Sequence, residues 1–361
     1  MLARNTYLEV NLKQIQNNVS KIIKRYPNYK YYIGVVKADC YGQGPIEPVK
    51  AIINGGCNYL AVATFDEALR IREEIKDIPI LCLGVIPAEY IKECIINNIS
   101  VTINSMEYLQ ELENKECKGL KVHLKINTGM NRLGIENCED VDRALKMIEQ
   151  REMNLEGIYT HLYDAENKDV YEKQISRFKN AIQKIDLNKI KIIHVSASEG
   201  LTNYEKLDFV NACRLGIIMY GFTNYKSLEL ESTVKLISEV EQIHKLNEGD
   251  TVGYGGTYKA KTNGEKIAVI PIGYADGIIR KNKGRDVYIN NKRYEIVGNI
   301  CMDMLFVKVD DDVKLHDKVL ILKDNKHIEE VAEHLDTIPY EVLCSIGKRV
   351  PRIYKWLNLN R

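Results

Sequence analysis

Short apolar runs alternate with amphipathic, helix-like stretches over most of the first 220 or so residues of this chain. The runs have the length and the turn boundaries typical of buried strands. They are Ile33–Val36, Tyr59–Ala63, Ile80–Leu83, Val101–Ile103, Leu120–Ile126, Leu155–Thr160, Ile190–Val195 and Arg214–Ile218. About eight β-α alternations in this length predict a (β/α)8 barrel of the TIM type.

The stretches between the runs carry helix signals. Thr64 and Glu67 have the spacing of a capping box, and Ser105 can cap the helix after the fourth run. Further helices are predicted at Ala88–Ile96, Val141–Arg151 and Tyr171–Ile185. A doubly wound open sheet is the rival architecture, but no G-x-G-x-x-G follows the first run, which favours the barrel.

The pattern changes near residue 230, after which strands and turns replace the alternation. Predicted strands are Val234–Ile243, Lys266–Ile272, Asp286–Ile289, Tyr294–Val297 and Met304–Val309, with one helix at Ile328–Leu335. The length of 361 residues exceeds one average domain. We therefore predict a barrel domain over residues 1–229 and a mainly β domain over residues 230–361.

Charge and cysteine content limit the classes of partner. The net charge of +1 gives no general attraction to nucleic acid or to an anionic membrane. No apolar run approaches the ~20 residues that span a bilayer, and the N-terminus lacks the apolar core of a signal peptide. The nine cysteines include no C-x-x-C pair. We expect a cytoplasmic protein with reduced thiols and no metal site.

Polar residues gather at the ends of the predicted strands. Lys37 ends the first run, and later runs end at or just before Lys125, Asn127, His161, Ser196 and Ser198, while Arg214 begins the last. A lone strand-end lysine is usually solvated. Near apolar walls, however, its neutral amine is favoured and can form a Schiff base with a carbonyl cofactor. Because active sites of such barrels lie at the carboxyl ends of the strands, several such residues together predict a shared site.

Ordered motifs over nearly the whole chain resemble those of the alanine racemase family. The first is VVKADCYGQG at residues 35–44, close to the family's VVKANAYGHG. The others are KINTGMNRLG at 125–134, CRLGIIMYG at 213–221, VGYGGTY at 252–258, PIGYADG at 271–277, GNICMDM at 298–304 and RVPR at 349–352. The resemblance implies an isomerase that interconverts L- and D-alanine with pyridoxal 5'-phosphate.

The resemblance also implies roles for individual residues. Lys37 would hold the cofactor as a Schiff base and act as one base, and Tyr254 would be the opposite base, from the second subunit of a homodimer. Cofactor contacts would come from Tyr41, His161, Ser198, Arg214, Gly216 and Ile217. Substrate contacts would come from Arg132, Met302 and Asp303, with support from Lys125, Tyr274 and Lys348. Lys125, which is carbamylated in many family members, would orient Arg132.

The chemistry of racemisation agrees with these implied roles. A proton leaves one face of the α-carbon and another returns to the opposite face, so two bases are needed on opposite sides. The cofactor delocalises the negative charge on that carbon. An arginine beside the pyridine nitrogen would keep that nitrogen unprotonated, because arginine does not give up its proton.

Besides Asp39, Cys40 and Gln43 in the first motif, the chain departs from the family pattern at four further positions. Asn127 replaces the usual aspartate, Asn131 a glycine and Asn299 a frequent arginine, and Lys348 stands where many members have tyrosine. A flexible cation in place of a flat ring could admit larger amino acids, so a serine or broad-specificity racemase is the alternative. A related barrel decarboxylase and a non-catalytic cofactor-binding protein are less favoured, because the second domain and Tyr254 fit a racemase.

Overall fold

The structure is a computed structural model in which residues 4–356 are described. Its contacts divide the chain into two compact units. One unit contains residues 15–40 and 45–230, and the other contains residues 4–14, 41–44 and 231–356 of the described range. No helix of the described part is both long and apolar enough to cross a membrane.

The first unit is built on a closed barrel of eight strands, each parallel to its neighbours. This confirms the predicted barrel. The strands are β2 (Tyr31–Val35), β3 (Tyr59–Val62), β4 (Ile80–Cys82), β5 (Ile99–Ile103), β6 (Lys121–Lys125), β7 (Asn154–Tyr159), β8 (Ile192–His194) and β9 (Ala212–Leu215). The pairing of β2 with β9 closes the ring.

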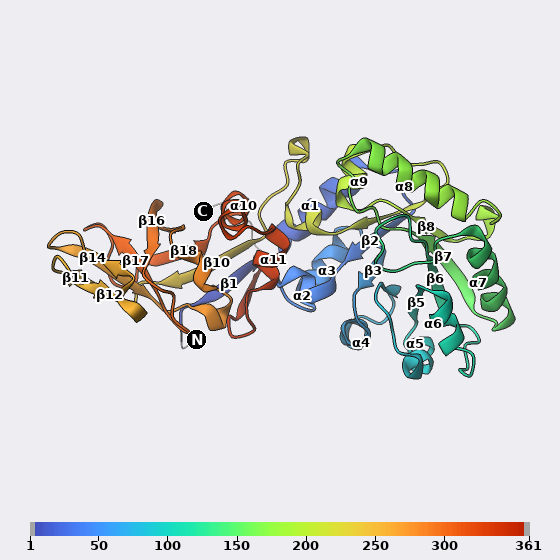
Figure 1. Cartoon of the computed structure of the whole chain (residues 1–361), viewed down its shortest axis with the longest axis horizontal. Helices are drawn as coiled ribbons and strands as arrows, with labels where there is room; N and C mark the ends of the chain where they lie inside the picture. The colour runs from blue at the N-terminus through green and yellow to red at the C-terminus, as the bar shows by residue number, and fades with distance from the viewer. Residues whose placement is uncertain (1–3, 357–361) are drawn as a thin grey trace. The chain divides into compact units, whose positions relative to one another are not determined.

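Helices connect successive strands and lie on the outside of the barrel (Figure 1). The α-helices are α1 (Leu12–Arg25), α3 (Glu47–Asn54), α4 (Phe65–Glu74), α5 (Ile91–Ile96), α6 (Met106–Glu111), α7 (Cys138–Gln150), α8 (Lys168–Ala181) and α9 (Ser198–Asn203). The segment α2 (Lys37–Tyr41) is a short left-handed turn. Short 3-10 turns are η1 (Ala88–Tyr90), η2 (Leu187–Lys189), η3 (Ile217–Tyr220) and η4 (Lys226–Leu228).

The structure confirms the two helix starts that the sequence predicted at Thr64 and Ser105. The Thr64 side chain accepts from the Glu67 amide, and the Glu67 carboxylate accepts from the Thr64 amide, at the start of α4. Ser105 caps α6.

The last run, predicted as one strand to Ile218, ends instead at Leu215, because the backbone leaves the extended conformation at Gly216 and η3 follows.

The second unit is a mainly antiparallel sheet of nine strands in the order β11-β14-β17-β16-β15-β18-β10-β1-β19. Its strands are β1 (Tyr7–Asn11), β10 (Val234–Glu239), β11 (Gln242–Leu246), β14 (Glu265–Ile270), β15 (Asp286–Ile289), β16 (Lys292–Val297), β17 (Leu305–Val309), β18 (Lys318–Leu322) and β19 (Arg352–Lys355). A short hairpin of β12 (Thr251–Val252) and β13 (Tyr258–Lys259) lies apart from the sheet order. Helices α10 (Asn325–Leu335) and α11 (Pro339–Cys344) and the turns η5 (Tyr254–Gly256), η6 (Tyr274–Asp276) and η7 (Arg280–Asn282) complete the unit.

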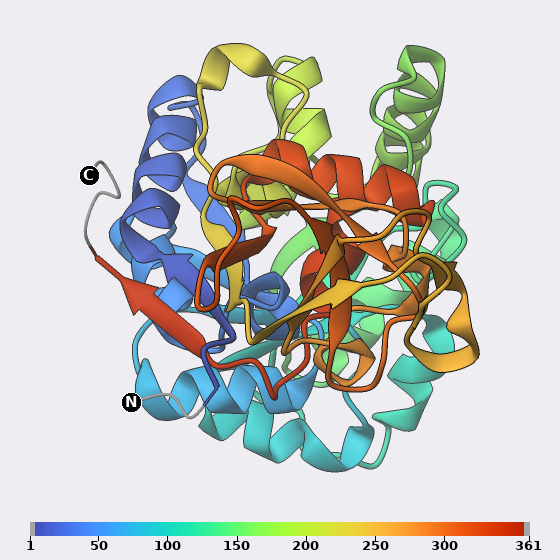
Figure 2. The same ribbon diagram turned by 90° about the vertical axis from the view of Figure 1, so that its left-hand side faces the viewer.

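Several features of this unit were not predicted, among them β18, β19 and α11. The N-terminal strand β1 lies in its sheet, antiparallel to β10 and parallel to β19, so that a dark blue and a red strand lie side by side in Figure 2. The run predicted as one strand from Val234 to Ile243 is two strands. The break occurs because Val240 donates to Asp317 whereas Glu241 donates to Val269, so the backbone changes partner. The domain boundary predicted between residues 229 and 230 stays a proposal.

Candidate active site

Lys37 follows β2 at the carboxyl end of the barrel and opens a left-handed turn. The next residues, Ala38, Asp39 and Cys40, have φ of 52°, 52° and 54° with positive ψ, and Tyr41 has φ of 56°. Each such conformation costs an L-residue about 1–2 kcal/mol. A run of four is therefore strained, and it must be held by the structure around it.

Contacts from α4 and β2 hold this turn. The Glu67 carboxylate that caps α4 also accepts from the Ala38 amide at 2.7 Å, and Arg70 pairs with Asp39 at 2.9 Å. The Cys40 amide donates to the Val36 carbonyl at 3.1 Å, and the Cys40 side chain is fully buried. The half-buried Lys37 thus leaves the barrel rim from a fixed backbone.

Arg214 is the largest side chain that is almost fully buried, and it lies on β9 inside the barrel. Its Nη2 donates to the carbonyls of Thr160 and Val195 at 2.9 and 2.8 Å, and lies 3.4 Å from Nδ1 of His161. Burial lowers the pKa of Arg214 to about 10, so the guanidinium remains a cation at neutral pH. A guanidinium only donates hydrogen bonds, so Nδ1 of His161 is the unprotonated acceptor.

The His161 ring is held neutral. Burial, followed by the positive charges of Arg214 and Arg132, lowers its pKa to about 3. The charges of Lys37 and Lys125, which lie at the carboxyl ends of β2 and β6, also contribute to this shift. The sequence predicted these residues to share a site, and the structure brings His161, Arg214 and the two lysines together at one end of the barrel.

Lys125, at the end of β6, is a buried amine among cations. Burial and then the charges of Arg132 and Arg214 lower its pKa to about 8. Its Nζ lies 5.7 Å from the ring centre of Tyr159, on the next strand. Arg132 is exposed on the loop that follows. An anion at this position would relieve the repulsion among these cations.

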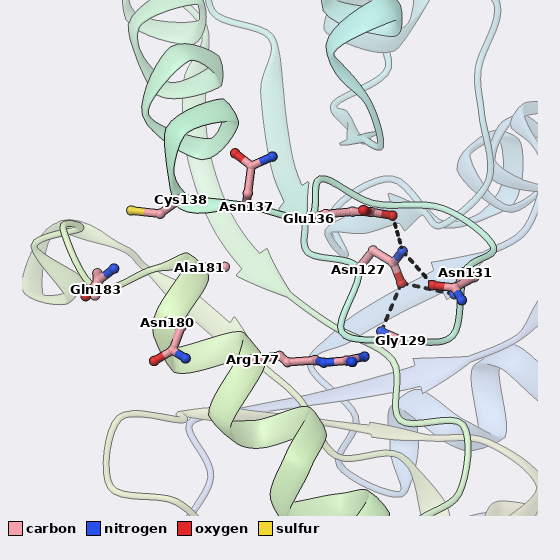
Figure 3. A pocket seen from close by; sticks show the side chains of 10 residues that line it. All are labelled: Asn127, Gly129, Asn131, Glu136, Asn137, Cys138, Arg177, Asn180, Ala181 and Gln183. Carbon is pink, nitrogen blue, oxygen red and sulfur yellow. Dashed lines mark hydrogen bonds between the residues drawn. The ribbon is translucent and has the colours of Figure 1, made fainter.

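The loop that carries Arg132 is organised by Asn127, one of the departures from the family pattern. The Asn127 side-chain oxygen accepts from the amides of Gly129 and Asn131 at 3.1 and 3.0 Å. Its Nδ2 donates to the Asn131 side chain at 3.1 Å and to Glu136 at 2.9 Å. These bonds are drawn in Figure 3. An aspartate here could not donate to Glu136, so the two residues match each other.

Asn131 accounts for a second departure. Its φ is 54°, a left-handed conformation that glycine adopts freely and that asparagine tolerates better than most residues. The surrounding pocket, of about 550 Å³, is lined by polar groups including Glu136 and Arg177 (Figure 3). Arg177 donates to the Thr128 carbonyl at 3.2 Å.

Three of the residues predicted to contact the phosphate lie at the carboxyl ends of the last two barrel strands, β8 and β9. Ser198 is half-buried and opens α9 after β8, and Gly216 and the buried Ile217 follow β9. Tyr41 falls in the other compact unit, where it is buried with its ring 5.8 Å from that of Tyr340.

In the second unit Tyr254 stands on an exposed glycine-rich turn, and 75% of its surface is accessible. Gly253, with φ of 68°, is needed because a Cβ there would lie 2.8 Å from Phe306. Asn299 donates from its side chain to the Tyr254 carbonyl at 2.8 Å. This third departure from the family pattern therefore holds the backbone of the predicted base.

The surface beside Tyr254 is an apolar hollow of about 540 Å³, lined by Met302, Met304 and Phe306 among others. Met302 and Met304 are 52% and 41% exposed. Single exposed apolar residues are common, whereas here two exposed methionines line one hollow together with an exposed tyrosine.

The remaining predicted residues of this unit lie near the same segments. Asp303 is exposed and pairs with Arg349 of the RVPR motif at 2.7 Å. Arg349 also lies 3.5 Å from the buried Asp276 of the PIGYADG motif. Tyr274 and Lys348 are exposed. Tyr254 and Lys37 belong to different compact units.

Comparison with known protein families matches residues 10–224 to the alanine racemase N-terminal domain and residues 233–354 to the alanine racemase C-terminal domain. The chain belongs to the alanine racemase family. It is 36% identical to alanine racemase of Staphylococcus saprophyticus over 97% of this chain and 95% of that protein. It is 35% identical to alanine racemase 1 of Bacillus subtilis over 97% and 93%.

Solved structures of the alanine racemase family share the fold along the whole chain. The crystal structure of alanine racemase from E. faecalis superposes with a TM-score of 0.91 at 34% identity and covers 98% of each chain. The alanine racemase from Bacillus anthracis with bound L-Ala-P gives a TM-score of 0.91 at 32% identity, over 98% of this chain and 96% of that one.

Sequence reasoning missed several residues that build the site. His194 contacts Arg214, and Glu67 holds the turn after Lys37, although the sequence marked Glu67 only as a cap. His194 could have been found because it is a polar residue inside an apolar strand run. Nothing in the sequence indicated that Glu67 reaches Ala38, which lies 29 positions away.

Proposed function

We propose that this chain is a pyridoxal-phosphate-dependent racemase that interconverts L- and D-alanine. Family membership supports the isomerase assignment. The observation that carries the proposal is the convergence of Lys37, His161 and the buried Arg214 at the carboxyl end of one barrel, the place where barrel enzymes react.

The residues fit the chemistry of pyridoxal phosphate. Lys37 offers the amine that would hold the aldehyde, and Arg214 offers a guanidinium that can donate to a pyridine nitrogen without protonating it. The neutral His161 would lie beside the ring without adding charge. Tyr41, Ser198, Gly216 and Ile217 would supply hydroxyl and backbone donors to the phosphate.

When bound, the cofactor supplies delocalisation of the negative charge that develops on the substrate's α-carbon. Lys37 would remove or return the α-proton on one face. Tyr254 of a second subunit would do so on the opposite face, because a hydroxyl on an exposed turn can be inserted into another chain's site. The exposed hollow at Met302 and Met304 supports such a homodimer.

Arg132 and the backbone amide of Met302 would bind the substrate carboxylate, with Asp303 and Tyr274 lining the approach. Lys125 would orient Arg132. With a pKa of about 8, roughly one-tenth of Lys125 is neutral at pH 7. The neutral amine can add carbon dioxide and release a proton to form a carbamate. That anion would neutralise part of the surrounding positive charge.

The nine cysteines are all free, which supports a reducing, cytoplasmic location. The second candidate function is a serine or broad-specificity racemase. It is favoured by one observation: Lys348 is exposed at a position where many family members carry tyrosine. A cation there can add a donor for a substrate hydroxyl.

The test is a chiral assay of all twenty amino acids with purified protein and added pyridoxal phosphate. We expect D-alanine from L-alanine, exchange of the α-hydrogen in deuterated water, and loss of both with Lys37→Ala. Lys30→Ala, an exposed lysine just before β2, is the control and should leave the rate unchanged. Turnover of no amino acid would refute the proposal, and faster turnover of serine than of alanine would favour the second candidate. Carbon dioxide released from basic amino acids would indicate the decarboxylase.

A further inference from the structure

A row of buried polar side chains runs through the barrel from Arg214. Nη1 of Arg214 lies 2.8 Å from Nδ1 of His194, and Nε2 of His194 lies 3.1 Å from Nδ1 of His123. Nε2 of His123 lies 3.4 Å from the Glu156 carboxylate. All four side chains are at most 2% exposed. Branched apolar residues normally fill such a barrel, so a connected polar row is unusual.

The protons along this row have one consistent arrangement. A guanidinium cannot accept, so Nδ1 of His194 must accept from Arg214, and the His194 proton is then on Nε2. That proton is donated to Nδ1 of His123, which leaves the His123 proton on Nε2, facing Glu156. Burial lowers the pKa of both histidines, so both rings are neutral. The row therefore joins a buried cation to a buried anion through two neutral rings.

Glu156 is held as an anion. Burial alone would raise its pKa, but the hydrogen bonds from His123, Lys191 and Tyr59 lower it below the usual range. Tyr59 and Ser100 also donate to the carboxylate at 2.7 and 2.8 Å. Lys191, 51% exposed, donates to the other oxygen at 2.8 Å.

The backbone is shaped to make these contacts. The pairing of β6 with β7 shifts register, so that Val122 faces Leu155 whereas His123 faces Gly157, and Glu156 is the extra residue. Such a bulge re-aims a side chain. A Cβ on Gly157 would lie 2.4 Å from Nδ1 of His123, so only glycine leaves room for that ring.

Within the described residues, no hydrogen-bond partner of Arg214 is a carboxylate; its partners are carbonyls and histidine rings. A buried cation without a counter-charge is expensive. We propose that Glu156, acting through His123 and His194, fixes the orientation of Arg214 and that all three are positioning residues. For catalysis, this inference rests on the proposed function, in which Arg214 faces the pyridine nitrogen.

The first experiment needs no cofactor. The full-length protein is labelled with nitrogen-15 in its seven histidines, whose ring shifts report which nitrogen carries the proton. We expect the rings of His123 and His194 to be neutral with the proton on Nε2, their signals being assigned by loss in H123Q and H194Q. Glu156→Gln should change the signals of both rings, because loss of the anion weakens the hydrogen bond from His123 and, through it, the bond from His194, while Arg214 still keeps the His194 proton on Nε2.

The second experiment uses the protein with pyridoxal phosphate. We expect Glu156→Gln to lower kcat for alanine about tenfold with KM within about twofold, and to shift the visible band of the cofactor. Glu152→Gln is the matched control. It lies just before the same strand, but it is exposed and pairs only with Lys118 among the described residues, so no change is expected.

Unchanged His194 signals together with unchanged kcat in Glu156→Gln would overturn the proposal. If Glu156→Gln does not fold, His123→Gln decides, because it breaks the row but leaves the contacts of Glu156 with Lys191, Tyr59 and Ser100. An unchanged His194 signal in that variant would equally overturn it. If the wild-type protein racemises nothing, the proposed function fails, whereas the histidine signals still test the row.

Discussion

The barrel interior around Arg214 and the surface around Tyr254 are built in opposite ways. Arg214 is almost fully buried, and its donors meet carbonyls and rings inside its own unit. Tyr254 is 75% exposed on a turn whose backbone alone is held, by Asn299. The barrel interior fixes both the position and the charge of the Arg214 side chain. The exposed turn fixes only the backbone from which the Tyr254 side chain projects.

This difference indicates which residues of the proposed site one chain can position by itself and which residue would come from a second chain. Burial sets the ionisation of Arg214, His161 and Lys125 within the barrel. Tyr254 instead lies on an exposed surface, beside a hollow lined by Met302 and Met304. We expect substitutions in the barrel to act in every copy by itself, and substitutions at Tyr254 to act through a second copy.

The largest expected effect tests the role of Tyr254 as the second base. Tyr254→Phe removes one proton-transferring group and should lower racemisation about 10²–10⁴-fold. Exchange of the α-hydrogen with deuterated water should continue for one enantiomer, because Lys37 still serves one face. Chiral chromatography and mass spectrometry measure both quantities.

Mixed dimers sharpen the comparison. Chains carrying Lys37→Ala, mixed and reassembled with chains carrying Tyr254→Phe, should regain part of the activity, because one of the two shared sites then has both groups. Tyr90→Phe, an exposed tyrosine of the barrel unit, is the control. Racemisation within twofold of wild type in Tyr254→Phe would contradict the assignment.

Substrate choice is the next largest expected effect. Lys348→Tyr restores the flat ring that many family members carry and should raise the ratio of kcat/KM for alanine over serine about tenfold. Competition assays with both amino acids measure the ratio. Lys355→Tyr, a substitution on β19, is the control. A constant ratio would mean that Lys348 does not contact the substrate.

A smaller effect is expected at the loop of Arg132. Asn127→Asp removes the donor to Glu136 and places two carboxylates together, so KM for alanine should rise about threefold with little change in kcat. The double variant with Glu136→Gln should restore KM, since glutamine can donate to the new aspartate. Equal KM values for the single and double variants would argue against this pairing.

The smallest effect concerns acid stability. His161 has a pKa of about 3 in the fold against about 6.5 in an unfolded chain. Between these values the unfolded state binds the extra proton, so the free energy of unfolding decreases as pH falls from about 6.5 towards 3. His161→Gln should flatten this decrease in urea titrations, whereas the exposed His244→Gln should not. A curve as steep as that of the wild type would contradict the neutral ring.

Periodicity and local capping determined much of the fold from the sequence. The alternation of apolar runs and helices indicated the barrel, and Thr64 and Ser105 marked helix starts that the structure confirms. Both signals act over a few residues and are therefore visible in one chain. The ordered motifs indicated the family, which the comparisons confirm.

Other features were decided only by tertiary structure. The left-handed turn after Lys37 depends on Glu67 and Arg70 of α4, and β1 finds its partners more than 200 residues away. The row from Arg214 to Glu156 needs a bulge that places the carboxylate against His123. Each arrangement joins residues from separate elements. Local preference cannot specify such contacts, because their free energy exists only once the barrel and the sheet have formed.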